Sequence, residues 1–423
     1  MNSTIDEDIT IYMRQPKGFE KTGPDGEEMV CLLQKAIYGL KQSGARWEAR
    51  LVQYLLGAGF TRCDIDPCLY LLRRDGETLL LVVYVDDLIM ASSKPELRQE
   101  VVEDLTKTFK LKDTGDLDWV FGTSIAQSKS LRTVSLHQTV YIDNLVQAYL
   151  SDKDRSVKER VTPCNDEILT IEPIKEGETI HPEYRTVVGK LGWLSLISRP
   201  DIAYAYSMLA KFSSSGTPRH FRLAIAVIKY LRRTRMYEIR YGSEEHNLHV
   251  DHIITGTNSR CDFTWPGEAL FYTDATYGGA RPMGGYVGYY HGAPFSWSGY
   301  RLSVTPLSSS ESELIAAIRA VTMATSTSET LKFLGYGGEH PAPVLCDNLA
   351  TVLLSENNTT SKRMKHIATR IAFLRENVEG KKVVLIHVST HQQIADIFTK
   401  PLSAAPFHVL REMLLRHPTE EIT

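Results

Sequence analysis

The chain has 423 residues, of which 43% are hydrophobic, and this length predicts two or three domains. Its 48 Lys and Arg residues nearly balance its 51 Asp and Glu residues, which excludes a uniformly basic nucleic-acid coat but allows local basic faces. None of the six cysteines belongs to a C-x-x-C pair, so we expect a reduced protein without structural zinc. No apolar run reaches the ~18 residues of a membrane span, so we expect a soluble intracellular protein with no membrane partner.

The first region extends to about residue 125 and predicts a helix followed by a strand pair. Between Trp47 and Leu55, apolar residues recur at helical spacing. The apolar runs CLYLLRR and TLLLVVY come next, joined by Asp75-Gly76, which is a strong hairpin signal. Residues 153–182 are charged and proline-bearing without clear periodicity, so we interpret them as a connection.

Residues 183–241 predict helices, and one of these helices has a basic face. From Arg219 to Arg240, apolar residues fall on one side of the predicted helix and basic residues fall on another. A solvated surface is the ordinary explanation for such a stripe, while a row of cations also suits contact with phosphates. We take four residues as candidates for nucleic-acid binding: Arg219, Arg222, Lys229 and Arg233.

The pattern changes after a turn-rich stretch at residues 242–268, which we interpret as a domain border. Three strand-like runs follow, then a helix from about Ser308, and then further strands and helices in alternation. This order predicts a mixed sheet with helices packed on it, and therefore an α+β chain. The predicted domains are residues 1–125, 126–250 and 262–423, and we expect the last to fold on its own.

Two adjacent aspartates, Asp86 and Asp87, lie between two apolar runs that are typical of strands. We therefore expect them at the tip of a tight hairpin, where their charges repel each other. An exposed polar turn is the ordinary explanation for an isolated Asp-Asp pair. The full pattern Tyr84-Val85-Asp86-Asp87 is more specific, and it favours a divalent-metal site, because Mg²⁺ prefers carboxylate oxygens. Paired metals at such a site would stabilise the entering and leaving oxygens of nucleotidyl transfer.

Four further acids lie at the ends of predicted strands and helices in the C-terminal region. Each alone is more often a cap or a surface residue. Brought together by the fold, they would suit two Mg²⁺ ions that activate water against a phosphodiester. These candidate catalytic and metal-binding residues are Asp274, Glu313, Asp347 and Asp396.

The helix that begins near Ser308 carries two glutamates, and only one of them can face a given metal. Glu311 and Glu313 point about 200° away from each other on a helix. Ser308 and Glu311 have the spacing of a capping box, which gives Glu311 a structural role at the helix start. We therefore predict that Glu313 is the ligand.

A series of motifs runs through the first 240 residues: IYMRQPKGF from Ile11, KAIYGLKQ from Lys35, YVDD, LKDTGDLDWVFGTSI from Leu111, YRTVVGKL from Tyr184 and RPDI from Arg199. In this order they resemble the reverse transcriptase of copia-type long-terminal-repeat retrotransposons. The resemblance implies a reverse-transcriptase palm followed by a helical thumb or connection. It also implies that Asp86 and Asp87 are metal ligands, and that Lys41 and Gln42 line the nucleotide and template site.

The chain departs from this family at one metal ligand. The family carries another metal-binding Asp a few residues ahead of the position that matches Asn2, and Asp6, Glu7 and Asp8 match a variable acidic turn instead. Because both metals need that further carboxylate, we expect DNA polymerisation to be lost in this chain. Synthesis would then occur only within a longer Pol polyprotein.

Four motifs of the C-terminal region also belong together: YTDA at Tyr272, S-S-x-E-x-E at Ser308, CDN at Cys346 and ADIFTKPL at Ala395. They resemble the copia-type ribonuclease H from about residue 269 to 415, and Glu313 matches that family's catalytic glutamate. The resemblance implies a ribonuclease H fold, Mg²⁺ or Mn²⁺ as cofactor, and hydrolysis of RNA in an RNA–DNA hybrid. It implies a location in cytoplasmic virus-like particles or in the nucleus.

Two rival interpretations stay open. In the first, the chain would be an inactive nucleic-acid-binding remnant of a retroelement, and in the second it would be an integrase-like nuclease of the ribonuclease H fold. The upstream YVDD motif counts against the second rival. His366 and Arg370 share a helix face and would contact the hybrid backbone, although a solvated face explains them equally well.

Overall fold

The structure is a computed structural model of the whole chain that describes residues 10–35, 37, 40, 43–130, 132–151, 160–242, 269–278, 282–337, 340–356 and 367–418. The chain divides into two compact units, Met1–Gly115 and Asp116–Thr423. No helix within the described ranges is both long and apolar enough to cross a membrane.

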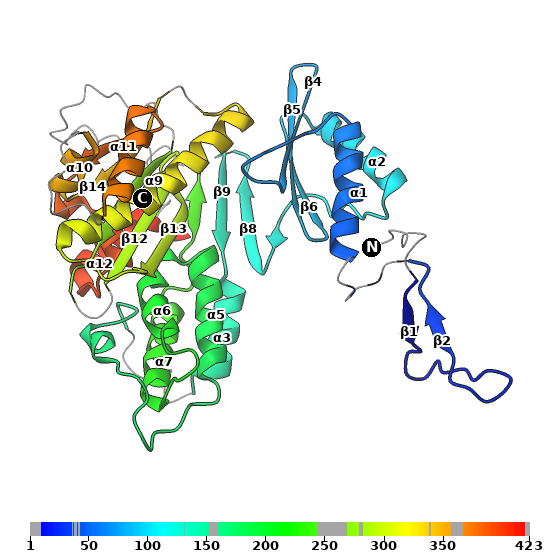
Figure 1. Cartoon of the computed structure of the whole chain (residues 1–423), viewed down its shortest axis with the longest axis horizontal. Coiled ribbons are helices and arrows are strands. Elements are labelled where there is room, and N and C mark those ends of the chain that lie inside the picture. Colours follow the sequence, from blue (N-terminus) through cyan, green and yellow to red (C-terminus); the bar gives the residue numbers. More distant parts are fainter. Residues whose placement is uncertain are drawn as a thin grey trace. The chain divides into compact units, whose positions relative to one another are not determined.

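The first unit is built around a four-stranded antiparallel sheet in the order β3-β4-β5-β6 (Figure 1). Tyr70 and Leu72 on β4 pair with Leu81 and Leu79 on β5, and this apolar face packs against helices α1 and α2. Strands β1 and β2 form a separate pair. The bounds are β1 Tyr12–Arg14, β2 Val30–Leu32, α1 Ser43–Gly57, β3 Thr61–Arg62, β4 Leu69–Arg74, β5 Glu77–Tyr84, β6 Asp87–Ser92 and α2 Pro95–Thr108.

Both predicted hairpins of this unit are present. Asp75 and Gly76 have φ angles of 53° and 80°, as a two-residue type I′ turn requires. At the second hairpin, Tyr84 pairs with Asp87, and Val85 adopts a φ of 54°, which is strained for a β-branched residue. Trp47 of α1 donates a hydrogen bond from Nε1 to the Val85 carbonyl at 3.3 Å, which helps to hold this turn.

The second unit begins with a four-stranded sheet in the order β10-β9-β8-β7 and a group of helices that pack on one another (Figure 1). Helix α7 starts at a capping box between Thr217 and His220, with Pro218 in its first turn. The bounds are β7 Trp119–Val120, β8 Thr123–Ser128, β9 Thr133–His137, α3 Thr139–Tyr149, η1 Asp166–Thr170, α5 Tyr184–Ile197, η2 Pro200–Ile202, α6 Ala203–Ala210, α7 Pro218–Arg233 and β10 Ile239–Tyr241.

The prediction that residues 183–241 are helical throughout is wrong at its end. Helix α7 ends at Arg233, and Ile239–Tyr241 form strand β10, which pairs antiparallel with β9. The alternation of Tyr237, Ile239 and Tyr241 has the period of a strand, and pairing with an available sheet edge decides the conformation.

The RPDI motif forms a buried ion pair that joins η2 to α7. Arg199 and Asp201 have fully buried side chains, and the guanidinium contacts both carboxylate oxygens at 2.9 and 2.7 Å. Arg199 also donates to the Thr234 carbonyl and hydroxyl, while the Tyr230 hydroxyl donates to Asp201. Because every charged atom here has a partner, the motif has a structural role.

The remaining strands form a five-stranded sheet in the order β13-β12-β11-β14-β15. Strand β12 is antiparallel to both β11 and β13, whereas β14 runs parallel to β11 and β15 runs parallel to β14. The bounds are β11 Leu270–Ala275, β12 Met283–Tyr290, β13 Ala293–Arg301, α9 Ser309–Leu334, β14 Ala342–Cys346, α10 Leu349–Glu356, α11 Ala368–Glu379, β15 Val383–His387, η4 Thr390–Gln392, η5 Ile394–Phe398 and α12 Ala404–Leu414.

Both faces of this sheet are covered. On β11, Phe271 faces a core formed with α9 and α11, while Leu270 and Tyr272 face a second core that includes η5, α12 and the helices of the bundle. Helix α9 crosses the first face (Figure 1). On the second face, Trp297 of β13 donates from Nε1 to the Ser195 carbonyl of α5 at 2.7 Å. The bundle and the five-stranded sheet therefore share one apolar core.

The predicted α+β class is confirmed. The first unit has two helices on one face of an antiparallel sheet, as expected for a partial palm, and the α3–α7 bundle lies within the segment predicted to be a thumb or connection. The five-stranded mixed sheet with α9 on one face is a ribonuclease H fold. The predicted border at residue 125 lies inside β8, and most of the predicted border at 242–268 lies outside the described residues.

Candidate active site

The first two acids of the predicted cluster lie at the ends of neighbouring parallel strands. Thr273 of β11 is the register partner of Cys346 of β14. Asp274 and Asp347 follow these two residues directly, so the strand pairing places them side by side. Asp274 is only 1% exposed. The next residue, Asn348, caps the start of α10, because its side-chain oxygen accepts a hydrogen bond from the Thr351 backbone N–H at 3.0 Å.

The third acid is Glu313, which lies in the first turns of α9. Ser308 caps this helix, because its hydroxyl oxygen accepts a hydrogen bond from the Glu311 N–H at 3.2 Å. The Glu311 carboxylate in turn accepts a hydrogen bond from the Leu307 N–H at 2.8 Å. Glu311 also lies 4.0 Å from Arg370. Glu313 instead faces the cluster, since its possible ligand atom lies within 4.8 Å of those of Cys346 and Asp347. The predicted division between a capping glutamate and a glutamate that faces the cluster is therefore present in the structure.

The fourth acid, Asp396, reaches the cluster because two glycines let its segment approach the sheet. Gly285 is the register partner of Asp274, and a Cβ added there would lie 2.7 Å from Phe398 Cβ and 2.9 Å from Thr399 Cγ2. A Cβ on Gly299 of β13 would lie 2.7 Å from the Phe398 carbonyl oxygen. A larger residue at either position would push η5, and Asp396 with it, away from Asp274.

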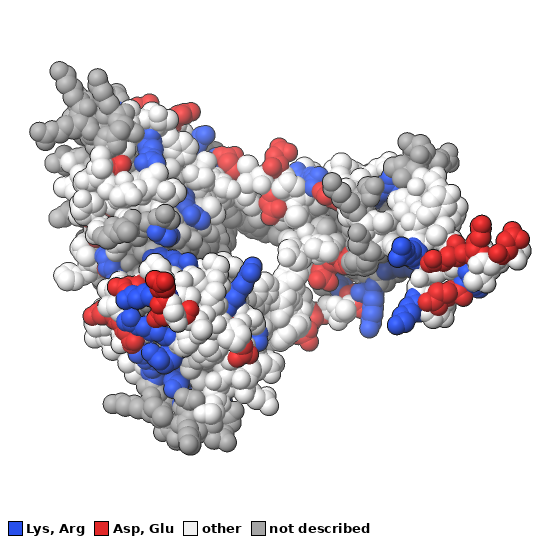
Figure 2. All heavy atoms as spheres, turned by 60° about the horizontal axis from the view of Figure 1, so that its bottom comes forward, with Lys and Arg blue, Asp and Glu red and all other residues white. Residues whose placement is uncertain are grey.

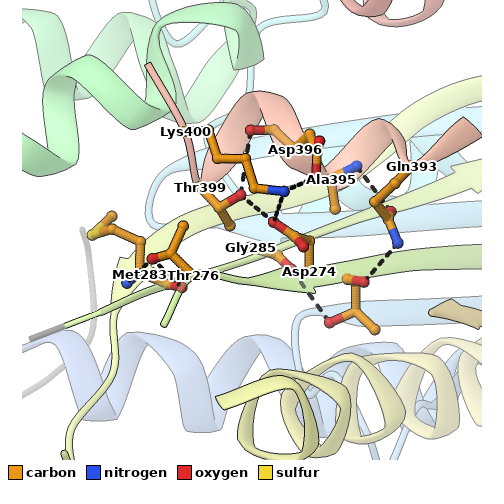
Figure 3. A network of polar contacts seen from close by, with 10 residues as sticks. Asp274, Thr276, Met283, Gly285, Gln393, Ala395, Asp396, Thr399 and Lys400 are labelled. Carbon is orange, nitrogen blue, oxygen red and sulfur yellow. Dashed lines mark hydrogen bonds and ion pairs between the residues drawn. The ribbon is translucent and has the colours of Figure 1, made fainter. Parts of the chain in front are cut away.

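Lys400 links two of the acids. Its Nζ lies 2.6 Å from Asp396 Oδ1 and 3.5 Å from Asp274 Oδ2 (Figure 3). The Thr399 hydroxyl donates to Asp274 Oδ2, and Gln393 donates from Nε2 to the Thr273 carbonyl at 2.9 Å. Sequence reasoning missed Lys400, although its position four residues after Asp396 was an available signal.

Crowding of buried negative charges changes the protonation of the cluster. Burial, together with Asp274 and Asp347, raises the pKa of Glu313 to about 9. Burial and Asp274 raise the pKa of Asp396 to about 7, and they also raise the pKa of Asp347. Burial alone would lower the pKa of Lys400, but the carboxylates of Asp274 and Asp396 outweigh it and raise that pKa. Glu313, Asp347 and Asp396 thus lie in a buried region of negative charge that Lys400 offsets only in part.

The donor set fits a divalent cation. The four acids supply carboxylate oxygens, which Mg²⁺ and Mn²⁺ prefer. Glu313 is 7% exposed, and its Oε2 has no hydrogen-bond partner among the described residues. A buried carboxylate oxygen without a partner is costly, and a cation would remove that cost. The arrangement therefore suits metal-assisted chemistry at the ends of β11 and β14.

The structure describes only some of the basic and polar residues that were predicted to bind nucleic acid. Arg219, Arg222 and Arg233 are exposed on α7 and Lys229 is half-buried, opposite the buried apolar face of the helix. Basic side chains gather in a line on one face of the second unit, with acidic side chains beside them (Figure 2). Arg219 donates to the Thr170 hydroxyl at 2.9 Å. Three other candidates, Lys41, Gln42 and His366, lie outside the described residues.

Asp86 and Asp87 lie in the first unit at the predicted hairpin tip, where both are exposed. Among the described residues, no third Asp, Glu, His or Cys joins them in a group of possible metal ligands. The acids Asp6, Glu7 and Asp8 lie outside the described residues.

Comparison with known proteins gives matches along almost the whole chain. Residues 1–158 match the family model "Reverse transcriptase (RNA-dependent DNA polymerase)". The retrovirus-related Pol polyprotein from transposon RE1 of Arabidopsis thaliana is 30% identical over 409 residues, which are 96% of this chain and 26% of that protein. The putative transposon Ty5-1 protein of Saccharomyces cerevisiae is 32% identical over 329 residues, which are 76% of this chain and 97% of that protein.

A second Arabidopsis polyprotein, from transposon RE2, is 31% identical over 94% of this chain and 26% of its own length. The chain thus spans about a quarter of the length of these two polyproteins. Solved structures with lower similarity include LC11-RNase H1 in complex with an RNA/DNA hybrid, at 18% identity and a TM-score of 0.25, covering 31% of this chain and 94% of that one. Another is the foamy viral protease-reverse transcriptase in complex with dsDNA, at 12% identity and a TM-score of 0.38, covering 92% and 69%.

Proposed function

The chain belongs to the Pol polyprotein family of copia-type retrotransposons, and from this premise we propose that its residues 269–418 hydrolyse the RNA strand of RNA–DNA hybrids with the help of Mg²⁺ or Mn²⁺. The observation that carries the proposal is the convergence of Asp274, Glu313, Asp347 and Asp396 from four separate elements. Such a cluster is unfavourable for stability alone, because buried acids repel one another. Perturbed carboxylates gathered at strand ends are typical of a catalytic site.

Each acid has a distinct role in this proposal. Asp274 is the central ligand, since it lies beside Asp347 and influences the pKa of the other three acids. Glu313 and Asp347 hold the metal on the α9 side, and Asp396 completes the set from η5. When bound, the divalent metal activates water and stabilises the charge that develops on the phosphate.

Lys400 is a positioning residue in this proposal. Its ammonium group holds Asp274 and Asp396 together and offsets part of their charge. Thr399 fixes the Asp274 carboxylate by donating a hydrogen bond to it. These two neighbours keep the acids near the geometry that metal binding needs.

The first unit has a different role in the proposal. Asp86 and Asp87 at the YVDD hairpin are the candidate ligands for DNA synthesis, and we propose that this chain does not perform it by itself. The partners are an RNA–DNA hybrid and a template strand, bound in part by the basic face of α7, together with the rest of a Pol polyprotein.

The test is hydrolysis of a labelled hybrid by the full chain, with Mg²⁺, with Mn²⁺ and with EDTA. We expect cleavage of the RNA strand only when a divalent metal is present, and none of the DNA strand. Hybrid binding without cleavage under all metal conditions would instead support an inactive remnant. Metal-dependent cleavage of double-stranded DNA in preference to the hybrid would support an integrase-like nuclease.

A further inference from the structure

One thiol lies beside the carboxylate cluster and takes no part in the proposed hydrolysis. Cys346 is the last residue of β14, immediately before Asp347, and its side chain belongs to the core on the α9 side of the sheet. The possible ligand atoms of Glu313, Cys346 and Asp347 all lie within 4.8 Å of one another. Ligand atoms about 2.0–2.3 Å from a tetrahedral ion lie roughly 3.5 Å apart, so small rotations of the two acids would close the group around one ion.

A second observation points to a ligand at this place. Glu313 Oε2 is buried and has no hydrogen-bond partner among the described residues, and the carboxylate that carries it lies within 4.8 Å of the sulfur and Asp347. Mg²⁺ could bind this oxygen together with other carboxylate oxygens, but it does not bind thiolates. A mixed set of sulfur and carboxylate oxygen is instead the donor set of softer cations.

The surroundings of the sulfur also suit a metal ligand. The Asn348 backbone N–H donates to Cys346 Sγ at 3.4 Å. Hydrogen bonds from backbone N–H groups stabilise metal-bound thiolates. Binding a cation through sulfur replaces the thiol proton, which passes to solvent.

We propose that Glu313, Cys346 and Asp347 form a metal site for a thiophilic divalent cation of the Zn²⁺ or Cd²⁺ class, distinct in its donor set from the all-oxygen site. Because both sites use Glu313 and Asp347, a thiophilic ion excludes the hydrolytic metal. Thiophilic cations therefore inhibit hydrolysis, and this consequence rests on the proposed function, whereas the binding itself does not.

Binding is tested by titrating the metal-free full chain with Cd²⁺ and following the ultraviolet charge-transfer absorption of a cadmium–thiolate bond. We expect one tight site in the parent protein. Cys346→Ala should lose the absorption and bind Cd²⁺ at least about tenfold more weakly, because a ligand is gone. Cys68→Ser, which removes an exposed thiol, should keep the tight site and serves as the matched control.

Glu313→Gln provides a second variant that leaves the thiol in place, and it should also weaken Cd²⁺ binding at least about tenfold. Thermal unfolding without metal checks that each variant is folded. If folded Cys346→Ala and Glu313→Gln both bind Cd²⁺ as tightly as the parent, with the absorption retained, the proposed site is wrong.

Inhibition is measured as the Cd²⁺ concentration that halves each protein's own Mg²⁺-dependent rate on a hybrid. We expect Cys346→Ala to need at least about ten times more Cd²⁺ than the parent. Equal concentrations for the two proteins would overturn the competition between sites. If neither protein hydrolyses the hybrid, the proposed function fails, while the Cd²⁺ titration still decides whether the thiophilic site exists.

Discussion

At Glu313, burial and neighbouring charge act in the same direction. Both disfavour the ionised carboxylate, so the folded state holds a proton on Glu313 up to a pKa of about 9, against 4.5 for the free side chain. Between these pH values the folded chain binds more protons than the unfolded chain. Stability without metal therefore falls as the pH rises through this range.

Glu313→Gln should reduce this pH dependence, because glutamine has the same size and does not ionise. We expect the free energy of unfolding of the variant, measured with EDTA by urea titration, to fall less than that of the parent between about pH 5.5 and 8.5. Glu376→Gln, which changes an exposed acid on α11, should follow the parent. Equal pH slopes for Glu313→Gln and the parent would show that Glu313 is ionised in both states.

Residue-scale features divide into those that local sequence predicts and those that it does not. The capping role of Glu311 followed from its spacing to Ser308, because a capping box is a local motif. Lys400 and Thr399 escaped prediction because their contact with Asp274 joins residues about 125 positions apart. The lack of a hydrogen-bond partner at Glu313 Oε2 likewise could not be predicted, because it depends on which residues of the fold pack around that oxygen.

At the scale of elements, helix α7 has one apolar and one basic side. Its apolar residues are buried, while Arg219 and Arg222 are exposed on the side away from the core. The capping box at Thr217 and the basic residues of the last turn both favour the helix. The basic side is thus held in a fixed orientation and suits contact with a regular row of phosphates.

Replacing Arg219 and Arg222 together with alanine should weaken hybrid binding and make it less sensitive to salt. If each arginine contacts one phosphate, the slope of log affinity against log salt should decrease in magnitude by about two. Lys129→Ala, at an exposed lysine 3.8 Å from Asp116, should leave the slope unchanged. Filter-binding titrations at several salt concentrations make the comparison, and an unaltered slope in the double variant would argue for a merely solvated face.

The YVDD hairpin places its two acids at an exposed tip. We expect no extension of a primed template by the full chain, because nucleotidyl transfer needs two metals held about 3.5–4 Å apart and adjacent acids on one tip do not hold both. Incorporation of labelled deoxynucleotides is the measurement. Robust extension that Asp86→Asn abolishes would contradict this, and would point to an additional acid outside the described residues.

Regular elements were predictable where the local pattern was strong. The Asp75-Gly76 pair predicted the hairpin between β4 and β5, and the apolar spacing from Trp47 predicted α1. Strand β10 was not predicted, because its three residues follow a long helix and depend on pairing with β9, whose residues precede them by about a hundred positions. Short strands at sheet edges are set by tertiary pairing more than by local preference.

At the scale of the molecule, the helical bundle and the ribonuclease H sheet form one body within the second unit. Their shared core joins Tyr230 of α7 to Phe407 of α12, and the backbone of Glu238 pairs with that of Arg416. This packing could not be predicted from the sequence, because the periodicity of each segment shows that it has a buried face but not what covers that face.

The shared core leads to a prediction about truncated chains. A piece with residues 116–423 should unfold cooperatively, and a piece with residues 262–423 should be less stable by at least about 3 kcal/mol, because removing the bundle exposes apolar side chains worth about 1.5–3 kcal/mol each. Urea unfolding followed by circular dichroism gives both values. Equal stability of the two pieces would instead support residues 262–423 as an independent domain.

The convergence of four acids from distant parts of the chain is the central feature of the molecule, and the charge of Asp274 raises the pKa of each of the other three. The most direct measurement is therefore the rate of RNA cleavage in a hybrid, with Mg²⁺, by Asp274→Asn beside the parent and Glu376→Gln. We predict a loss of at least about 100-fold for Asp274→Asn, because the change removes a metal ligand at constant size, and no loss for Glu376→Gln. Parental rates for a folded Asp274→Asn protein, in preparations cleared of host nuclease, would contradict the account.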